Sequence, residues 1–314
     1  MIVMGFTLIN TSSCTKDDDN KNNPATTDNY ASVSNFIAAN SSPMQTCTLD
    51  CSVGGTFTTP NGTIVSIPAS AFITQNGSLA TGTVTIKFKD VYRKSDMLFN
   101  GVSTNLYGGG PMKSAGMFYI KAMQGTQALN LRWGNKITIK QPFNGLAMDN
   151  QMKPFILQKV DSLNGWVAPQ PDSIGYPSDS LYWNASSYIF SLYQFNSPID
   201  SGTWSNSDNP SFFSAYSQTI LALHPNFSCS DYSPELFLLF SGVNSMVHVY
   251  WDGINFSYNF APLGLKCTAV AIGTKGGKLY SSFTPITISN NMTVNFTLTE
   301  TTTADFKTQL NALN

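Results

Sequence analysis

Side chains that commonly carry out catalysis are few in this chain and lie far apart. The two histidines, His224 and His248, fall in separate apolar segments, and no spacing joins either one to a carboxylate. The sequence contains no nucleophile elbow, zinc-protease helix, phosphate loop or dinucleotide fingerprint. The acidic run 17–19 lacks the glycine turn and distal glutamate of a calcium loop. We therefore expect no catalytic residues, no metal site and no cofactor.

The first twenty residues combine an apolar, a small-residue and an acidic segment. The apolar run 2–9 is too short to span a bilayer, and it is followed by Thr11-Ser12-Ser13-Cys14 and then by the acidic run. This order resembles a bacterial lipoprotein signal in which Cys14 is lipidated, and the acidic tail resembles the export signal of surface lipoproteins in the Bacteroidetes. The resemblance implies a lipid-anchored protein of the outer membrane, exposed at the cell surface. The alternative is a disordered N-terminus that happens to contain a cysteine.

One part of a secretory signal is missing. Such signals begin with a basic segment, but no Lys or Arg precedes Lys16. We expect an in-frame start upstream of Met1 that encodes one or more basic residues.

The remaining four cysteines, Cys47, Cys51, Cys229 and Cys267, allow three pairings in an oxidising compartment. We expect one disulfide between Cys229 and Cys267 and a small local loop between Cys47 and Cys51. Buried free thiols are the alternative. A zinc site suits the sequence less well, because no histidine lies near Cys47 and Cys51.

Composition favours an exported all-β protein. Only 11% of the residues are charged and the net charge is −1, which gives no electrostatic basis for binding nucleic acid. Asp outnumbers Glu sixteen to two, and Asp is typical of turns whereas Glu is typical of helices.

The pattern along the chain predicts two antiparallel β-sandwich domains in tandem, with a short C-terminal helix and a disordered N-terminal tether. The boundaries we expect are 1–14 for the signal, 15–50 for the tether, 51–150 for the first sandwich, 151–180 for a connecting strand and linker, and 181–314 for the second sandwich with its helix. Within 82–89, Val84, Ile86 and Phe88 should face the core. Phe306, Leu310 and Leu313 lie at helical spacing, with Thr303 as the cap.

The first sandwich carries a resemblance to a known family. Gly54-Gly55-Thr-Phe, followed by Gly62-Thr-Ile-Val-Ser-Ile-Pro68-Ala-Ser-Ala-Phe72, resembles the opening of the ZU-type domain of zonula occludens proteins and netrin receptors. Residues 82–131 resemble a bacterial version found in Bacteroidetes lipoproteins of unknown function. The resemblance covers about residues 54–145. It implies a β-sandwich fold and says almost nothing about activity.

Two features could serve a surface role. Trp166, Trp183 and Trp204 lie in or beside loop-like stretches and could form a glycan platform, although core packing is the alternative for each ring. Three Asp-Ser-apolar strings place Ser162, Ser173 and Ser180 in a form that resembles O-glycosylation acceptors of exported Bacteroidetes proteins. The alternative is a turn-rich loop in which Asp and Ser satisfy the backbone.

These observations favour a non-catalytic cell-surface lipoprotein that acts as a binding or structural module. Its expected partners are the membrane, through the lipid anchor, and a glycan or a surface protein. The alternative function is a glycan-binding component of an outer-membrane nutrient-uptake system.

Overall fold

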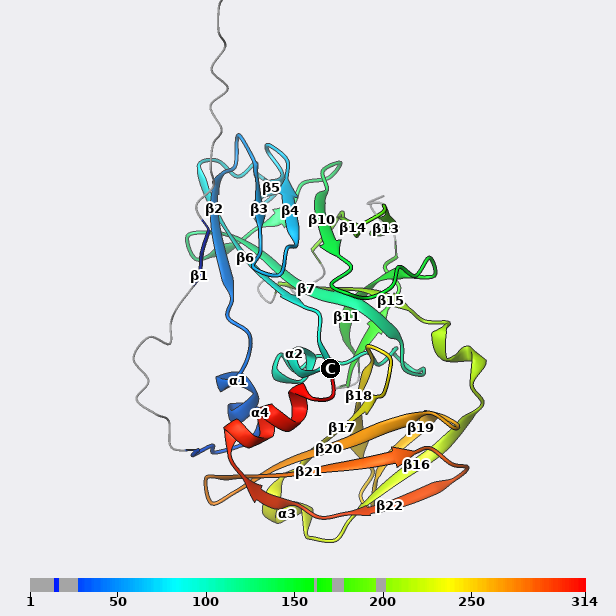
Figure 1. Ribbon diagram of the computed structural model, residues 1–314. Coiled ribbons are helices and arrows are strands. Elements are labelled where there is room, and N and C mark those ends of the chain that lie inside the picture. Colours follow the sequence, from blue (N-terminus) through cyan, green and yellow to red (C-terminus); the bar gives the residue numbers. More distant parts are fainter. Residues whose placement is uncertain (1–13, 17–27, 161–162, 171–177, 196–201) are drawn as a thin grey trace, which may run out of the picture.

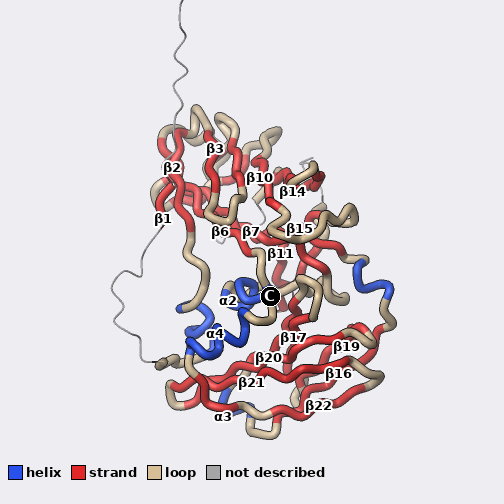
Figure 2. Tube along the Cα trace, in the orientation of Figure 1, coloured by secondary structure: helices blue, strands red, loops and turns tan. Residues whose placement is uncertain are grey.

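The chain folds mostly into β-strands joined by short turns, with a few short helices (Figures 1 and 2). The computed structural model describes residues 14–16, 28–160, 163–170, 178–195 and 202–314. Its sheets are largely antiparallel and a helix follows the last strand, which confirms the all-β expectation at this coarse level. No helix in these residues is long and apolar enough to cross a membrane. We call residues up to 209 the N-terminal half and residues from 210 onward the C-terminal half.

The N-terminal half consists of two facing sheets, a small two-stranded sheet and two helices. Its strands are β1 (Cys14–Lys16), β2 (Gln45–Asp50), β3 (Gly55–Thr58), β4 (Ile64–Ile67), β5 (Phe72–Ile73), β6 (Thr83–Val91), β7 (Lys113–Gln124), β8 (Gln127–Ala128), β9 (Asn130–Leu131), β10 (Ile137–Pro142), β11 (Lys153–Val160), β12 (Leu163–Val167), β13 (Ser180–Trp183), β14 (Ser187–Leu192) and β15 (Thr203–Asn209). Its helices are α1 (Val33–Ala39) and α2 (Lys94–Phe99).

The two facing sheets enclose the first core. One sheet has the strand order β1-β2-β6-β7-β15-β11-β12, and the other has the order β13-β14-β10-β4-β3. Val84, Ile86 and Phe88 of β6 are fully buried in this core, as their period-two spacing predicts. Thr85 and Lys87 on the opposite face are half-buried rather than exposed, because neighbouring strands shield side chains on the same face of a sheet.

The Asn61-Gly62 turn joins β3 to β4 as an antiparallel hairpin. Gly62 has a φ of +84°, a conformation that glycine adopts without steric cost, and its N–H donates to the main-chain oxygen of Thr59. This turn projects Asn61 toward the end of β6, and it thereby helps to build the site described below.

The C-terminal half is one curled sheet. Its elements are the 3₁₀ helix η2 (Phe212–Ala215), β16 (Gln218–Pro225), α3 (Cys229–Tyr232), β17 (Glu235–Phe240), β18 (Met246–Trp251), β19 (Phe256–Pro262), β20 (Lys266–Lys275), β21 (Lys278–Thr287), β22 (Met292–Phe296), β23 (Thr299–Thr301) and α4 (Thr303–Asn311). The strand order is β22-β16-β19-β18-β17-β20-β21-β23, and β22 runs parallel to β16. Leu238, Phe240 and Val249 belong to the core inside the curl.

A second apolar cluster joins the two halves. It includes Phe36 of α1, Leu98 of α2, Phe237 of β17, Ile272 of β20 and Phe306 of α4. The rings of Phe36 and Phe306 meet edge to face with their centroids 5.3 Å apart. β17 and β20 of the curled sheet therefore contribute apolar side chains both to this cluster and to the core inside the curl. Figure 1 shows α1, α2 and α4 beside the sheet.

The structure corrects the expected boundary at residue 181. β14 pairs with β10, and β15 lies between β7 and β11, so residues 180–209 complete the sheets of the N-terminal half. The Pro- and Ser-rich composition of the preceding stretch suggested a linker, but the chain returns after it to the same pair of sheets.

Two further expectations need correction near the ends. Residues 28–50, expected as part of the tether, include α1, with buried Val33 and Phe36, and β2, which pairs with β6. The apolar run 2–9 and the acidic run 17–19 lie outside the described residues. At the other end, Thr302 rather than Thr303 caps α4, and Phe306 and Leu310 are buried as predicted.

Candidate functional site

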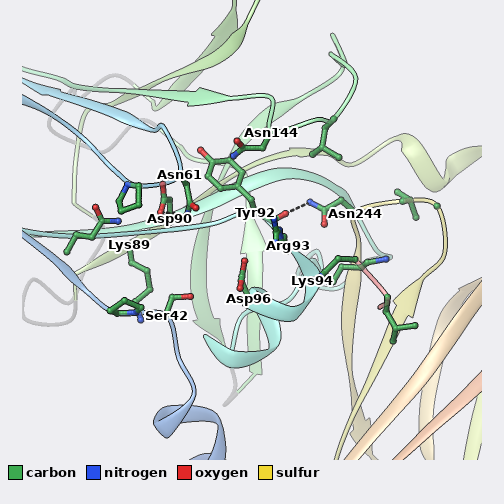
Figure 3. A pocket seen from close by; sticks show the side chains of 18 residues that line it. Ser42, Asn61, Lys89, Asp90, Tyr92, Arg93, Lys94, Asp96, Asn144 and Asn244 are labelled. Carbon is green, nitrogen blue, oxygen red and sulfur yellow. Dashed lines mark hydrogen bonds between the residues drawn. The ribbon is translucent and has the colours of Figure 1, made fainter. Parts of the chain in front are cut away.

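A pocket of about 750 Å³ opens where the two halves meet (Figure 3). Its walls come from the end of β6, the first turn of α2, the β3–β4 turn, the loop after β10 and the β17–β18 turn. The side chains that matter most are Asn61, Asp90, Tyr92, Arg93, Asp96 and Asn244. We call this feature the junction pocket. Its volume falls within the range of sites that bind small molecules.

Asp90 is buried at the end of β6 and accepts three hydrogen bonds. Its Oδ2 accepts from the hydroxyls of Thr59 and Thr63, each at 2.6 Å, and its Oδ1 accepts from Asn61 Nδ2 at 2.9 Å. The Thr63 hydroxyl also lies 2.6 Å from the hydroxyl of Tyr92. These bonds fix the β3–β4 turn against β6, and they leave Asp90 little capacity to accept a further proton donor.

Two lysines of the pocket wall point their ammonium groups at internal acceptors. Lys89 Nζ donates to Asn100 Oδ1 at 2.8 Å, and Lys94 Nζ donates to the main-chain oxygen of Phe240 at 2.8 Å. Burial lowers the pKa of Lys89, and it lowers the pKa of Lys94 to about 8, because a charged amine loses hydration in these positions. The bond from Lys94 crosses from α2 in the N-terminal half to β17 in the C-terminal half.

Arg93 and Asp96 stand at the start of α2. Figure 3 shows both between Lys89 on one side and Lys94 on the other. Burial raises the pKa of Asp96, and the positive charge of Arg93 opposes that rise. The start of α2 is held by Asn314, whose Oδ1 accepts from the N–H of Ser95 at 3.0 Å.

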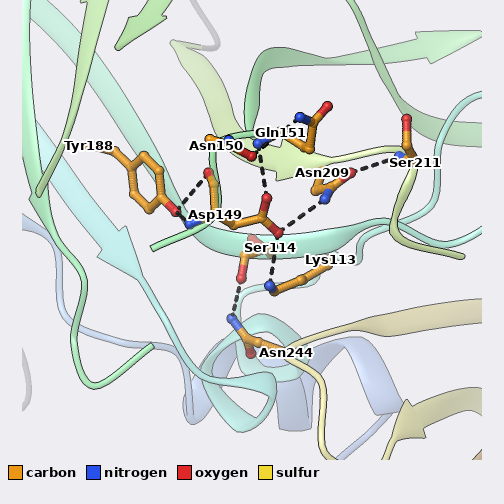
Figure 4. A network of polar contacts seen from close by, with 9 residues as sticks. All are labelled: Lys113, Ser114, Asp149, Asn150, Gln151, Tyr188, Asn209, Ser211 and Asn244. Carbon is orange, nitrogen blue, oxygen red and sulfur yellow. Dashed lines mark hydrogen bonds and ion pairs between the residues drawn. The ribbon is translucent and has the colours of Figure 1, made fainter. Parts of the chain in front are cut away.

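Asn244 forms the wall contributed by the C-terminal half. Its Nδ2 donates to the main-chain oxygens of Tyr92 at 2.9 Å and Ser114 at 3.0 Å. Ser114 follows Lys113, which forms an ion pair of 2.9 Å with Asp149, and Asn209 also donates to that carboxylate at 3.0 Å (Figure 4). The bonds between Ser114 and Asn244 connect the β17–β18 turn to β7, the strand that carries Lys113.

The two histidines lie apart from the junction pocket and have separate partners. His224 Nδ1 lies 2.9 Å from Asn255 Oδ1, and His248 Nε2 lies 2.6 Å from Glu235 Oε2. The His248 ring also stacks on Phe237, with centroids 4.8 Å apart. Sequence reasoning missed Glu235 as a partner, because only the pairing of β17 with β18 brings it to His248.

The structure does not assemble the expected tryptophan platform. Trp166 belongs to β12 and is 1% exposed, and its indole N–H donates to the main-chain oxygen of Ser103. Trp204 of β15 packs against the same apolar cluster as Trp166. Trp183 is 40% exposed on β13, which lies in the other sheet. Trp166 is therefore a core residue, and a glycan site cannot use its ring.

Of the three serines expected as glycan acceptors, only Ser180 lies within the described residues. It is exposed at the start of β13, next to the buried carboxyl of Asp179. Ser162 and Ser173 lie outside the described residues. Asp179 Oδ1 accepts from the N–H of Tyr193 at 2.8 Å, so this aspartate satisfies a local backbone group, as the turn interpretation expects.

Neither expected disulfide is present among the described cysteines, because Cys51, Cys229 and Cys267 are free thiols, and the disulfide that Cys47 forms is therefore not with Cys51. Cys47 lies inside extended β2, and Cys51 follows four residues later, about 13 Å along the chain. Tyr232 of α3 packs next to Gly273 of β20, about 20 Å along the strand from Cys267. A disulfide requires Cα atoms within about 7 Å, which explains why neither pairing forms.

Sequence reasoning missed the junction pocket, although one signal was present. Residues 87–96 contain six charged side chains, Lys87, Lys89, Asp90, Arg93, Lys94 and Asp96, in a chain that is only 11% charged. Such a cluster directly after an alternating apolar strand indicates the end of a sheet where charged groups converge. The contributions of Asn61 and Asn244 had no such signal, because they reach the pocket only through tertiary packing.

Among the described residues, no three side chains of His, Cys, Asp or Glu gather where they could hold a metal ion. A scan of the chain against protein-family models finds no match, and a comparison with curated proteins finds no significant relative.

Proposed function

We propose that this chain is a non-catalytic binding module displayed at the cell surface on lipid attached to Cys14. The junction pocket is the observation that carries the binding role. Its walls come from both halves, and internal hydrogen bonds of Asp90, Lys94 and Asn244 hold them before any ligand arrives. A preorganised site of this kind loses little conformational entropy on binding.

The chemistry of the carboxylates favours binding over catalysis. A general base needs a free lone pair directed at its substrate. Asp90 already accepts three hydrogen bonds and is buried. Asp96 is then the pocket's remaining carboxylate, and the histidine paired with a carboxylate, His248, lies elsewhere.

The resemblance to ZU-type domains is part of the same proposal. Two facing sheets around one core support a β-sandwich in the N-terminal half. The curled sheet of the C-terminal half also encloses a single core, as a second β-sandwich would. The junction pocket supports a binding role better than a purely structural role without a ligand.

The alternative role, a glycan-binding component of an outer-membrane nutrient-uptake system, no longer has its expected tryptophan platform. It is supported instead by the polar lining of the junction pocket, where carboxylate, guanidinium and amide groups meet.

Labelling with a palmitate analogue in the native host tests the anchor. The wild type and Cys229→Ser should be labelled, Cys14→Ser should not, and an external protease should remove the wild-type protein from intact cells. Equal labelling of Cys14→Ser and the wild type would refute the anchor. If the protein is labelled with the palmitate analogue but resists the external protease on intact cells, surface display is refuted.

A further inference from the structure

Only some of the polar groups in the junction pocket remain available to a ligand. Asp90 accepts from three neighbours, Lys89 donates to Asn100, and Lys94 donates to Phe240. Both N–H bonds of the Asn244 amide are also used. Internal bonding thus occupies most of the charged groups that line the pocket.

Several lining groups keep free capacity, and four of them are Arg93, Asp96, Asn61 and Asn244. Arg93 is exposed, and in the described part of the chain its guanidinium makes no hydrogen bond or ion pair, which leaves five N–H donors. The Asp96 carboxylate has lone pairs beyond the one that accepts from the N–H of Arg93. The amide oxygens of Asn61 and Asn244 are acceptors, since their Nδ2 atoms are the donors in the bonds above.

These four groups together carry no net charge. One cation, Arg93, is balanced by one anion, Asp96, whereas the internally bonded Lys89, Lys94 and Asp90 bring the formal charge of the whole lining to +1. A ligand with a strong charge of either sign would meet a repelling group close to the attracting one. A ligand that matches the site must both donate and accept hydrogen bonds at closely spaced points.

From this balance we propose that the junction pocket binds a short neutral saccharide. Each sugar hydroxyl donates and accepts, and neighbouring hydroxyls match the planar, paired atoms of a carboxylate or a guanidinium. Leu146 and Val243 give the pocket an apolar wall for the C–H face of a sugar ring. A half-open pocket of about 750 Å³ suits a short oligosaccharide better than an extended peptide strand. The proposal rests on the binding function and names its ligand class.

The test is a glycan array of neutral and acidic oligosaccharides, followed by calorimetry with the best neutral ligand. Arg93→Gln and Asp96→Asn should each weaken its Kd about tenfold or more, because each removes a charge-assisted hydrogen bond. The chain has two arginines, so Arg132→Gln, an exposed site away from the pocket, is the matched control for Arg93. Asp231→Asn, in a surface ion pair, is the control for Asp96. Both controls should keep the wild-type Kd.

Salt dependence separates the ligand classes. Binding of a neutral saccharide should change little between low and high salt, whereas binding of an anion should weaken steeply. Binding limited to acidic sugars would overturn the saccharide proposal and leave the binding function intact. The same conclusion would follow if the pocket bound peptides from a peptide library and Arg93→Gln abolished that binding. An array without any neutral ligand, or equal Kd values for Arg93→Gln and the wild type, would overturn the proposed site. Palmitate labelling and protease treatment test the lipid anchor and surface display, and their results do not depend on the saccharide experiments.

Discussion

The ammonium nitrogen of Lys94 lies 2.8 Å from the main-chain oxygen of Phe240, and this buried bond ties α2 to the end of β17. Burial lowers the pKa of Lys94 to about 8. The bond sets the position of the β17–β18 turn, and with it the placement of Asn244 in the junction pocket.

Lys94→Met should change how stability depends on alkaline pH. The pKa of Lys94 is lower in the folded chain than its usual 10.5, so the unfolded chain binds the proton more tightly and the wild type gains stability as pH rises from about 8 to 10.5. Relative to Lys94→Met, the wild type should gain about 2–3 kcal/mol over this range. Urea unfolding at pH 8 and pH 10.5 measures the difference. Lys266→Met is the control, and parallel curves for Lys94→Met and the wild type would contradict the prediction.

Asp179→Asn should stabilise the protein at neutral pH. Burial raises the pKa of Asp179 to about 7, so the folded chain holds this proton more tightly than the unfolded chain. Its contribution to stability is full below about pH 4 and is lost as pH rises to about 7. The asparagine keeps an oxygen that can accept from Tyr193 but does not titrate. At pH 8 the variant should exceed the wild type by about 2–4 kcal/mol more than it does at pH 4. An equal difference at both pH values would show that Asp179 does not titrate in this range.

Phe88→Ala should destabilise the fold far more than Lys87→Ala. Phe88 is fully buried between the two facing sheets, and its loss should cost about 3–5 kcal/mol. Lys87 is half-buried on the opposite face, and its truncation should cost under about 0.5 kcal/mol. Similar urea midpoints for the two variants would place β6 in the wrong register.

A tryptophan pair tests the placement of the indole rings. Trp166→Ala removes a buried ring and its hydrogen bond to Ser103, and it should cost about 3–5 kcal/mol. Trp183→Ala removes a ring that is 40% exposed, and its cost should stay under about 1 kcal/mol. Thermal unfolding measures both, and a larger loss for Trp183→Ala would reverse the assignment of core and surface.

Thiol labelling tests the free cysteines. Burial raises the pKa of Cys267 to about 12, so a maleimide should reach this thiol only after unfolding. Cys229 is half-buried, and its thiol should react faster in the folded protein. Mass spectrometry of the unreduced, unfolded protein should show labels on both residues. If neither residue is labelled until a reductant is added, the expected disulfide exists after all.

Local patterns predicted the parts of the fold that local chemistry controls. Three features depend only on residues that are close in sequence. They are the alternation in β6, the Asn61-Gly62 turn and the helical spacing of Phe306 and Leu310. The junction pocket and the apolar cluster between the halves depend on contacts between distant segments. A single sequence gives little sign of which strands will meet.

Strand β15 shows this limit most clearly. Its Ser205, Asn206, Ser207 and Asp208 are fully buried, although their composition is typical of a surface loop. Ser207 donates to Gln141, and Asn206 accepts from Ser114, so partners in β10 and β7 make the burial tolerable. Burial also raises the pKa of Asp208 well above its usual value. No feature of residues 203–209 alone indicates these partners.

The hydroxyls of Tyr30 and Thr303 lie 2.9 Å apart although 273 residues separate them along the chain. The cluster around Phe36 and Phe306 thus closes a loop of about the same length. Loops of this length close late in folding, because the entropic cost of bringing their ends together must be met before the stabilising contacts form. During synthesis, α1 can pack early against Phe99 of α2, but its contact with Phe306 forms only after α4 has been made. A nascent chain that lacks α4 should therefore expose part of the apolar face of α1 that the folded protein buries.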